Sequence, residues 1–442
     1  MQVRVLAWSS LAEQDKRKII ERSEQDIAAV FPRVREIIEK VRAEGDAALI
    51  EYTRQFNNAD LTGIPLAVTE QEFEKAEKSL DAPVKDAIRF CVSNVRAYHE
   101  QQLPGAMSFG EVLPGVYAGE RATPVPSVAL YAPRGKGSFP SSTYMMAVPA
   151  QVAGVSRVVV VSPPDSTGAC DPATIFAARL CGVHEVYRVG GVQAIAALAY
   201  GTRSIRPVLK LLGPGNQYVT AAKRLLFGVI DVGLPAGPSE SMILADDSAD
   251  PRLLALDLII EAEHGSDSQA LLVTTSLSSA RAVAALLPRL VSELPEPRAS
   301  YAAQVLANYG GIILAADMNE AVEIANDVAP EHLQIATTDP FETLSRIRNA
   351  GEILLGQHTP FSLANYAIGA NAVLPTGGKA KTSSPLSVRD FLKYSSVAYL
   401  TRQGHESLRD AAIVLADYEG FPAHAKALRE RRGNEPEKDR HG

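Results

Sequence analysis

The chain has 442 residues, 46% of them hydrophobic and 21% charged, which is the composition of a globular protein of two or three domains. Its formal net charge of −7 argues against nucleic acid or an anionic membrane as a partner. No stretch approaches the roughly 18 apolar residues of a membrane span, and no signal peptide is predicted. Three cysteines without CxxC spacing predict small core side chains and a reducing, cytoplasmic location, not disulfides or a thiolate zinc site.

Helices come first in the chain, and alternating strands and helices follow. Apolar side chains recur at helical spacing in residues 12–27, 31–56 and 70–102, with Pro83 marking a break or a new helix start. From about residue 125, short runs rich in β-branched residues alternate with helical stretches. This alternation predicts an α/β fold with parallel sheets covered on both faces. The predicted strands form two series, residues 127–133, 157–164, 184–191, 208–216 and 241–247, then 270–276, 311–317, 332–337 and 352–356.

Three glycine-containing turns are candidates for binding a ligand, because ligands of open α/β sheets bind beyond the carboxyl ends of strands. They are residues 213–216, 190–193 and 236–241, and none has the GxGxxG spacing of the common dinucleotide site. Each one alone is better explained as a plain strand-to-helix turn than as a binding loop. Three in one α/β unit favour a ligand crevice.

Two polar pairs are candidates for chemistry. Glu331 and His332 directly precede a short apolar strand, where a carboxylate and an imidazole can divide acid/base work; the alternative is a solvated loop. Glu261 and His264 lie three residues apart at the end of a predicted helix that starts after Asp250-Pro251. On one helix face they can ligate the same divalent ion, and the alternative is an ordinary helix end.

The last third of the chain adds two segments of interest. Residues 361–378 form a long Gly/Asn-rich stretch, predicted to be a functional loop. Glu419 and His424 precede a basic helix, where a histidine is commonly a surface or capping residue. The charged segment 427–442 is predicted to be disordered.

The motifs AEHG, GPGNQYV, AGPSE, APEHL, VLPTGG and EGxxAHA, in this order, resemble the histidinol dehydrogenase family over nearly the whole chain. The resemblance implies a zinc-dependent, NAD-linked enzyme of histidine biosynthesis that oxidises L-histidinol to L-histidine in two steps through the aldehyde. It also implies a homodimer with intertwined chains and two incomplete Rossmann-like domains. The implied domains are a helical N-terminal extension (1–24), a discontinuous substrate and metal domain (25–125 and 241–385), an NAD-binding domain (126–240) and a C-terminal extension (386–442).

The resemblance also implies roles for individual residues. His332 would take the alcohol proton, and Glu331 would activate water for attack on the aldehyde. NAD contacts fall on Tyr131, Gln193 and Asn216. Substrate contacts fall on Ser239, Glu261, His264, His332, Asn365, Glu419 and His424, and four of these, Glu261, His264, Asn365 and His424, would hold one zinc ion per subunit.

The metal set departs from the family pattern of Gln, His, Asp and His. Glu261 stands at the Gln position and Asn365 at the Asp position. One ligand gains a negative charge and the other loses one, so the total charge is unchanged. Because zinc accepts carboxylate oxygen and, more weakly, amide oxygen, we predict a compensated swap that keeps the site.

The substrate pocket also departs from the family. Ala372 replaces the histidine of the family's NHVLPT, and the lost hydrogen bond should weaken recognition of a polar substrate by roughly 1–3 kcal/mol. Arg134 and Lys136 add positive charge beside the presumed NAD crevice. They are candidates to meet the cofactor phosphates or a more acidic substrate, and solvated loop residues are the alternative.

Three hypotheses are therefore open. The first is a zinc- and NAD-dependent dehydrogenase of L-histidinol. The second is a paralogue with the same chemistry on another polar alcohol. The third is a non-catalytic NAD-binding relative, against which the adjacent Glu331 and His332 argue.

Overall fold

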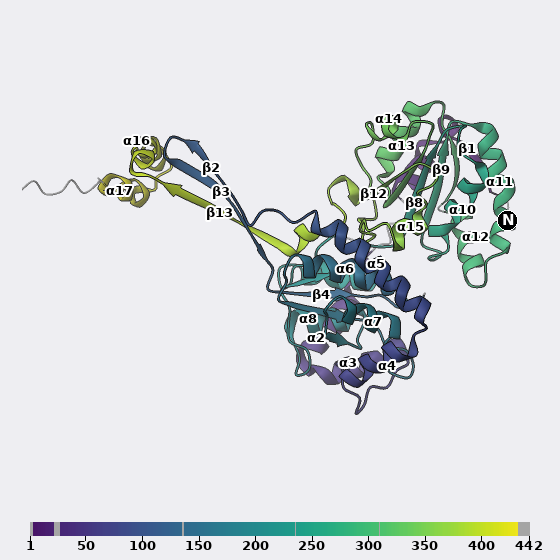
Figure 1. Ribbon diagram of the computed structural model, residues 1–442, viewed down its shortest axis with the longest axis horizontal. Helices are drawn as coiled ribbons and strands as arrows, with labels where there is room; N and C mark the ends of the chain where they lie inside the picture. The colour runs from purple at the N-terminus through teal and green to yellow at the C-terminus, as the bar shows by residue number, and fades with distance from the viewer. Residues whose placement is uncertain (1–2, 22–26, 135–136, 235, 309, 432–442) are drawn as a thin grey trace, which may run out of the picture. The chain divides into compact units, whose positions relative to one another are not determined.

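The computed structural model describes residues 3–21, 27–134, 137–234, 236–308 and 310–431. The chain divides into two compact units, one of residues 1–103 and 125–391 and one of residues 104–124 and 392–442. The first unit contains two parallel sheets, and the second contains one antiparallel sheet (Figure 1). Parallel strands with helical connections confirm the predicted α/β fold class, and every predicted strand is present.

A six-stranded parallel sheet forms one half of the first unit, in the order β1 (Val5–Ala7), β10 (Gly311–Leu314), β9 (Gln269–Thr274), β8 (Glu240–Ala245), β11 (His332–Ala336) and β12 (Glu352–Leu355). Its strands are almost wholly apolar because both faces are covered. Ile243 and Leu272 face one core, and their neighbours Met242 and Leu271 face the other.

Helices cover the two faces of this sheet (Figure 1). One face carries α10 (Pro251–Ala262), α11 (Leu277–Ser292) and α12 (Arg298–Asn308). The other face carries α13 (Met318–Val328) and α14 (Pro340–Leu344), with α1 (Glu13–Glu21) packed against α13. The remaining short elements are η1 (Trp8–Ser10), α15 (Phe361–Tyr366) and η3 (Lys379–Lys381).

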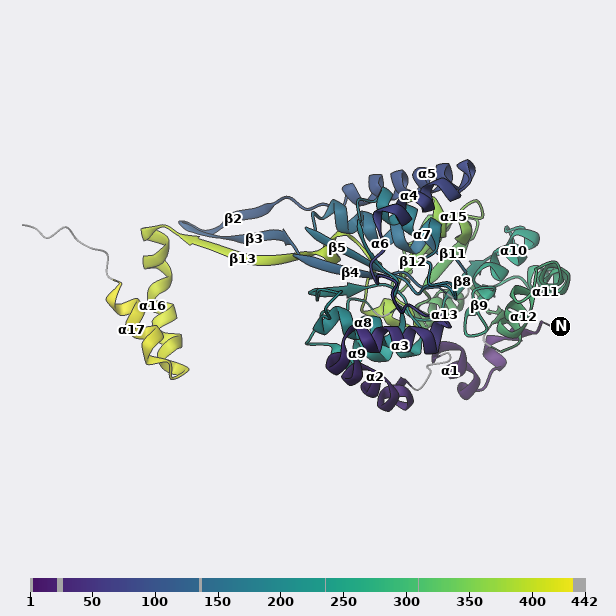
Figure 2. The ribbon, with the colours of Figure 1, turned by 90° about the horizontal axis from the view of Figure 1, so that it is seen from below.

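A four-stranded parallel sheet forms the other half, in the order β6 (Glu185–Tyr187), β5 (Arg157–Val161), β4 (Ser127–Tyr131) and β7 (Lys210–Leu212). Figure 2 shows helices on both faces of this sheet. One group is α4 (Glu70–Ser79), α5 (Ala82–Glu100), α6 (Pro140–Val152) and α7 (Pro172–Leu180). The other is α2 (Phe31–Glu44), α3 (Asp46–Asn57), α8 (Gly191–Tyr200) and α9 (Gln217–Leu226), with η2 (Ile27–Val30) beside them.

The packing of the N-terminal residues differs from the expected domain boundaries. Residues 31–100 were assigned to the substrate and metal domain, but α2 packs on α8 and α9, α4 on α7, and α5 on α6. Their apolar faces join the core of the four-stranded sheet, through Val34, Ile37 and Leu49 among others. The first residues are not a separate helical extension, because β1 pairs with β10 at the edge of the six-stranded sheet.

The second unit contains a sheet that the sequence did not predict. Strands β2 (Met107–Leu113), β3 (Val116–Pro124) and β13 (Leu392–Leu400) pair antiparallel in the order β13-β3-β2. Helices α16 (Arg402–Tyr418) and α17 (Pro422–Glu430) follow, and η4 (Val388–Phe391) ends the first unit. Residues 104–124 therefore form one unit with residues 392–442, whereas the expected C-terminal extension consisted of residues 386–442 alone. Residues 427–430 are helical, and the rest of the predicted disordered tail, from 432 on, lies outside the described residues.

Among the described residues, no helix is both long enough and apolar enough to cross a membrane.

Candidate active site

A cavity of about 1020 Å³ in the first unit is lined by residues of both parallel sheets. On the four-stranded sheet the lining follows the carboxyl ends of β4 and β7, as expected from the general behaviour of such sheets. On the six-stranded sheet the lining lies at the amino ends of β8, β9 and β11, which the general rule does not predict. At the start of β8, the backbone N–H of Glu240 donates to a carboxylate oxygen of Glu331.

Glu331 and His332 are buried at this cavity, with 7% and 2% of their surfaces exposed, so they are not solvated loop residues. The Nε2 atom of His332 lies 3.9 Å from Oε1 of Glu331, which is beyond hydrogen-bond length. Its Nδ1 atom lies 2.9 Å from Oε2 of Glu352. The imidazole also packs edge-on against Phe361, with ring centroids 5.8 Å apart. One ring nitrogen is thus engaged, and the other is available beside Glu331.

The surroundings shift the pKa values of both Glu331 and His332. Burial raises the pKa of the Glu331 carboxyl, and the charge of His332 only partly opposes the shift. Burial acts to lower the pKa of His332, but the charge of Glu331 and the hydrogen bond to Glu352 outweigh burial and raise it. Both shifts favour the proton-bound form, so each group holds a proton tightly once it has taken one from a group in the cavity.

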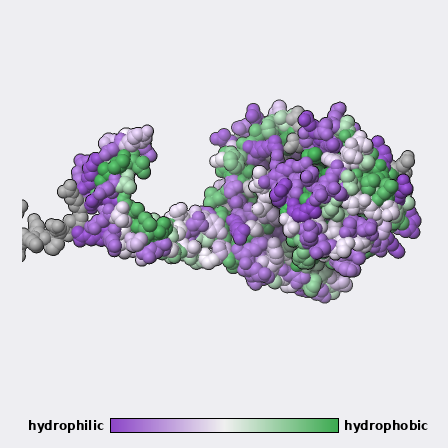
Figure 3. All heavy atoms as spheres, turned by 90° about the horizontal axis from the view of Figure 1, so that it is seen from above, coloured by the Kyte–Doolittle hydropathy of each residue, from purple (hydrophilic) through white to green (hydrophobic). Residues whose placement is uncertain are grey.

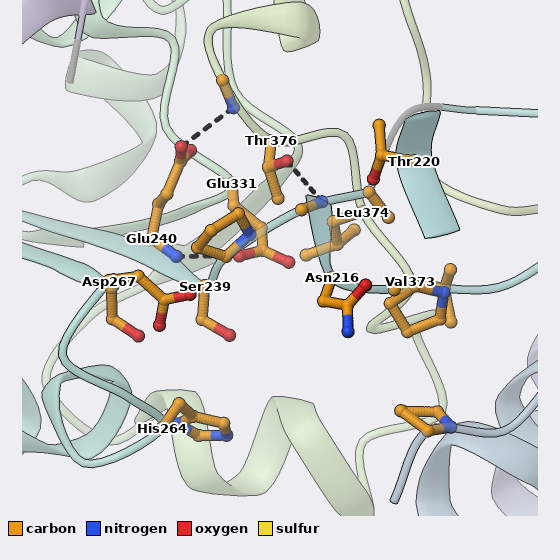
Figure 4. Close-up of a pocket in the computed structure, with 18 of the residues that line it drawn as sticks. Asn216, Thr220, Ser239, Glu240, His264, Asp267, Glu331, Val373, Leu374 and Thr376 are labelled. Carbon is orange, nitrogen blue, oxygen red and sulfur yellow. Dashed lines mark hydrogen bonds between the residues drawn. The ribbon is translucent and has the colours of Figure 1, made fainter. Parts of the chain in front are cut away.

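Three hydrogen bonds join the segments that surround Glu331 (Figure 4). The N–H of Glu240 donates to Glu331 Oε2 at 2.8 Å, and the N–H of Gly377 donates to Glu240 Oε1 at 2.8 Å. The N–H of Gly237 donates to Thr376 Oγ1 at 2.7 Å. These contacts tie the turn before β8 to residues 373–378, the irregular part of the predicted long loop. The first part of that loop is helical instead, as α15.

Glu261, His264 and Asn365 form a second cluster on the same cavity. The Asn365 amide donates to Glu261 Oε1 at 2.7 Å, and His264 Nδ1 lies 3.2 Å from Glu261 Oε2. The expected placement of Glu261 and His264 on one helix face is wrong in detail. Helix α10 ends at Ala262, and a turn closed by the bond from His264 N to Glu261 O brings the imidazole back over the carboxylate.

The Glu261 carboxylate is 1% exposed, and its surroundings favour the charged form. Burial acts to raise its pKa, but the charges of His264 and His332 act against burial. Hydrogen bonds from the Asn365 and Ser239 side chains act in the same direction, so the pKa is lowered. A buried carboxylate that stays charged beside an imidazole and an amide is a donor set suited to a divalent cation.

The other two residues predicted to complete the metal and substrate sites, His424 and Glu419, belong to the second unit. His424 lies in α17, and Glu419 follows the end of α16. Within the described part of the chain, no three His, Cys, Asp or Glu side chains are placed to hold one metal ion. The first unit therefore provides three of the four predicted donors together, one of which is the amide of Asn365.

Two of the three predicted cofactor residues line the cavity. Asn216 caps α9, its Oδ1 accepting the N–H groups of Tyr218 and Val219. Tyr131 ends β4, and its hydroxyl accepts the N–H of Gly191 at 3.0 Å. Gln193 is 1% exposed and does not line the cavity, and its amide has no partner among the described residues.

The turn before Asn216 requires a glycine at its first position. Gly213 has a φ of +121°, and a Cβ atom there would lie 2.4 Å from the carbonyl oxygen of Tyr131. The buried ammonium of Lys223 donates to the Gly213 carbonyl, and burial lowers the pKa of Lys223 to about 8. The glycine turn, the helix cap and the buried lysine together make a rigid N-terminus for α9, of the kind that suits a phosphate group.

The remaining predicted residues are placed as follows. Ser239 and Ala372 line the cavity, and Figure 4 shows Ser239, Asn216 and His264 around the same hollow. Arg134 also lines the cavity, but its guanidinium donates to the Ala169 carbonyl and faces Asp165. Lys136 lies outside the described residues.

Glu240 and Glu352 are site residues that the sequence did not single out. Both are the first residues of apolar strands, and both are buried, with 5% and 8% of their surfaces exposed. A charged residue at the start of an otherwise apolar strand is the signal that the sequence offered. That signal gives no partner, because the contacts with Glu331 and His332 depend on how three strands pair.

The fold and this arrangement define an α/β protein in which a buried Glu-His pair and a glycine turn that leads into a helix share one cavity. Comparison with known proteins gives the family. The family model described as histidinol dehydrogenase matches residues 20–432. The chain therefore belongs to the histidinol dehydrogenase family, a family of NAD-dependent oxidoreductases.

Individual relatives agree with this assignment over the full length. The chain is 51% identical over 428 residues to a histidinol dehydrogenase of Synechocystis sp., covering 97% of this chain and 99% of that one. It is 50% identical over 422 residues to a "histidinol dehydrogenase homolog" of Rhizobium meliloti, covering 95% and 92%. The structure matches a crystal structure of histidinol dehydrogenase from Elizabethkingia anophelis with a TM-score of 0.91 at 32% identity, covering 98% of each chain.

Proposed function

We propose that this protein catalyses the NAD-linked, two-step oxidation of a polar primary alcohol to the carboxylic acid, with L-histidinol as the first candidate substrate. The observation that carries the proposal is the buried pair of Glu331 and His332 on the cavity that also holds the Asn216 turn. The names of the full-length relatives supply the candidate substrate.

The residues divide the proton chemistry between the two steps. In the first step, Nε2 of His332 takes the proton of the alcohol, whose carbon becomes an aldehyde. In the second, the Glu331 carboxylate takes a proton from the water that attacks the aldehyde carbon. Tyr131 and the Asn216 turn would hold NAD, which would supply the hydride acceptor for both steps. The sum per alcohol is one water and two NAD⁺ consumed, with one carboxylate, two NADH and three protons formed.

We further propose zinc as the metal, one ion per subunit, held by Glu261, His264, Asn365 and His424. Carboxylate oxygen, amide oxygen and imidazole nitrogen are donors that zinc accepts, and Glu261 already contacts both Asn365 and His264. For Asn365 to ligate, its amide must turn so that the oxygen faces the ion. When bound, zinc polarises the alcohol and aldehyde oxygen as a Lewis acid.

A homodimer is proposed to bring His424 to this site. In support, the second unit exposes large apolar side chains that a lone subunit would leave in water (Figure 3). Nine of them are between 40% and 66% exposed, namely Met107, Phe109, Val112, Leu113, Tyr394, Tyr399, Val414, Leu415 and Phe421. Light scattering should give twice the mass of one chain, and a monomer at micromolar concentration would contradict the proposal. A cytoplasmic location remains an expectation from the cysteine pattern.

A second candidate function has the same chemistry on another polar alcohol. The observation that favours it is Ala372, which lines the cavity where the family pattern has a histidine. An alanine offers no hydrogen bond to the polar end of a substrate. Histidinol dehydrogenase homologs are also among the relatives, at about the same identity as the named enzymes.

Replacing Ala372 by histidine distinguishes the two candidates. If L-histidinol is the substrate, we expect Ala372→His to raise kcat/KM for L-histidinol by about 5- to 150-fold, the equivalent of roughly 1–3 kcal/mol from a restored hydrogen bond. Ala372→Leu fills similar space without hydrogen bonds and is the matched control. An unchanged or lower kcat/KM in Ala372→His, with activity on other alcohols in the wild type, would favour the second candidate.

The direct test of the proposed function is NADH formation by purified, zinc-loaded protein. L-Histidinol is assayed first and then a panel of polar primary alcohols, including acidic ones. NADH formation with any of them supports the dehydrogenase chemistry, and the preferred alcohol decides between the two candidates. No NADH with any alcohol, in a protein that holds zinc, would contradict the proposal.

A further inference from the structure

Glu352 contacts the catalytic imidazole from the side away from the cavity. It opens β12, and the parallel pairing of β11 and β12 sets it directly opposite His332. Its Oε2 lies 2.9 Å from Nδ1 of His332. Glu352 does not line the cavity, so it acts on the site only through His332.

The backbone fixes this contact. The N–H of Glu352 donates to the Glu331 carbonyl at 2.8 Å, and the N–H of Gly351 donates to the Pro330 carbonyl at 2.9 Å. A Cβ atom on Gly351 would lie 2.5 Å from the Glu331 carbonyl oxygen, so glycine permits the close approach. The start of β12 is therefore hydrogen-bonded to the segment that carries Glu331 and His332, which keeps the backbone of Glu352 beside the His332 ring.

Burial makes a purely structural role for this carboxylate unfavourable. The Glu352 side chain is 6% exposed, and its Oε1 has no hydrogen-bond partner among the described residues. A buried carboxylate with one unsatisfied oxygen costs stability, unless a positive charge nearby offsets the cost. The only imidazole in contact with it among the described residues is His332, which becomes positively charged when it takes a proton.

We propose that Glu352 is a positioning residue that holds His332 as the general base for alcohol oxidation. An ionised carboxylate can only accept, so Nδ1 carries the hydrogen and the lone pair lies on Nε2, the atom beside Glu331. When Nε2 takes the alcohol proton and the hydride leaves the same carbon for NAD⁺, the imidazolium faces the Glu352 charge. The neighbouring carboxylates, Glu352 included, also raise the pKa of His332 against the effect of burial.

This inference rests on the proposed function, and its kinetic test separates Glu352 from a packing role. Glu352→Gln keeps the shape and an acceptor oxygen but removes the charge, and Glu352→Ala removes both. We expect kcat from the alcohol to fall about 10- to 100-fold in Glu352→Gln, with KM changed little, and to fall further in Glu352→Ala. Oxidation that starts from the aldehyde should fall less, because Glu331 serves that step.

A matched control is Glu185→Gln, since Glu185 also opens a strand and binds a side chain, Arg157, away from the cavity. It should leave both rates unchanged even if it lowers the melting temperature. A kcat from the alcohol within about twofold of wild type in folded Glu352→Gln and Glu352→Ala would overturn the proposal. Equal losses from alcohol and aldehyde would also overturn it, because they would indicate a general disturbance of the site.

A spectroscopic test needs no substrate and stands apart from the proposed function. In protein labelled with ¹⁵N-histidine, the Nδ1–H of His332 should give a low-field proton signal, assigned by its loss in His332→Asn. We expect that signal in the wild type and its loss in Glu352→Ala, whether or not any alcohol is turned over. Absence of the signal in the wild type, or its persistence in Glu352→Ala, would overturn the inference.

Discussion

Replacement of His332 by asparagine is expected to lower kcat by about 10²- to 10⁴-fold, the range that general acid–base catalysis contributes. Asparagine has no basic nitrogen, so the alcohol proton has no acceptor at the position of Nε2. The fold should persist, because an amide can still donate to Glu352, which otherwise would be left as an unpaired buried carboxylate. NAD binding should also persist. Steady-state kinetics measure kcat, fluorescence quenching measures NAD binding, and a melting curve measures stability.

The matched control is His184→Asn, which makes the same change at an exposed histidine just before β6. It should leave kcat, NAD binding and the melting temperature unchanged. Turnover in His332→Asn within tenfold of wild type would mean that another group takes the proton. Loss of NAD binding in that variant would mean that the substitution disturbs more than the acid/base pair.

Replacement of His264 by alanine is expected to remove the metal, and activity with it. His264 is the nitrogen donor that the first unit contributes to the cluster with Glu261 and Asn365. Without it, two oxygen donors and the distant-in-sequence His424 remain, which is too few to hold zinc against dialysis. Stability should change little, because the His264 side chain is 31% exposed.

Metal analysis after dialysis measures this directly, as zinc per subunit. Wild type should hold about one ion and His264→Ala far less than one. The control His358→Ala changes an exposed histidine after β12 and should hold as much zinc as wild type. Stoichiometric zinc in His264→Ala would place the metal elsewhere in the protein.

The parallel strands were predictable because each is a short apolar run bounded by glycine or proline, which is the pattern of a strand buried on both faces. The antiparallel sheet was not, because β2 is exposed along its whole length and its apolar residues are interrupted by Gly110 and Glu111, so it lacks the pattern of a buried strand. The packing of α2 to α5 on the four-stranded sheet could not be predicted from the sequence either. An amphipathic helix shows which face it buries, but not which sheet receives that face.

The residues of the site also divide into those that the local sequence predicts and those that it does not. The capped turn at Asn216 and the pair Glu331 and His332 follow from local sequence, because glycines, a helix cap and a polar dipeptide are visible there. The contact of Asn365 with Glu261 joins residues 104 positions apart. The hydrogen bonds that Glu240 and Glu352 make to Glu331 and His332 depend on strand register. Register is set by long-range pairing, which a single sequence does not display.

The measurement that tests the central proposal most directly is the amount of NADH formed per alcohol consumed, with product analysis, in zinc-loaded protein and excess NAD⁺. Because Glu331 and His332 serve successive steps at one cavity, the proposed function predicts two NADH and one carboxylic acid per alcohol. One NADH with accumulation of the aldehyde, or no NADH with L-histidinol and every other polar alcohol tried, would contradict it.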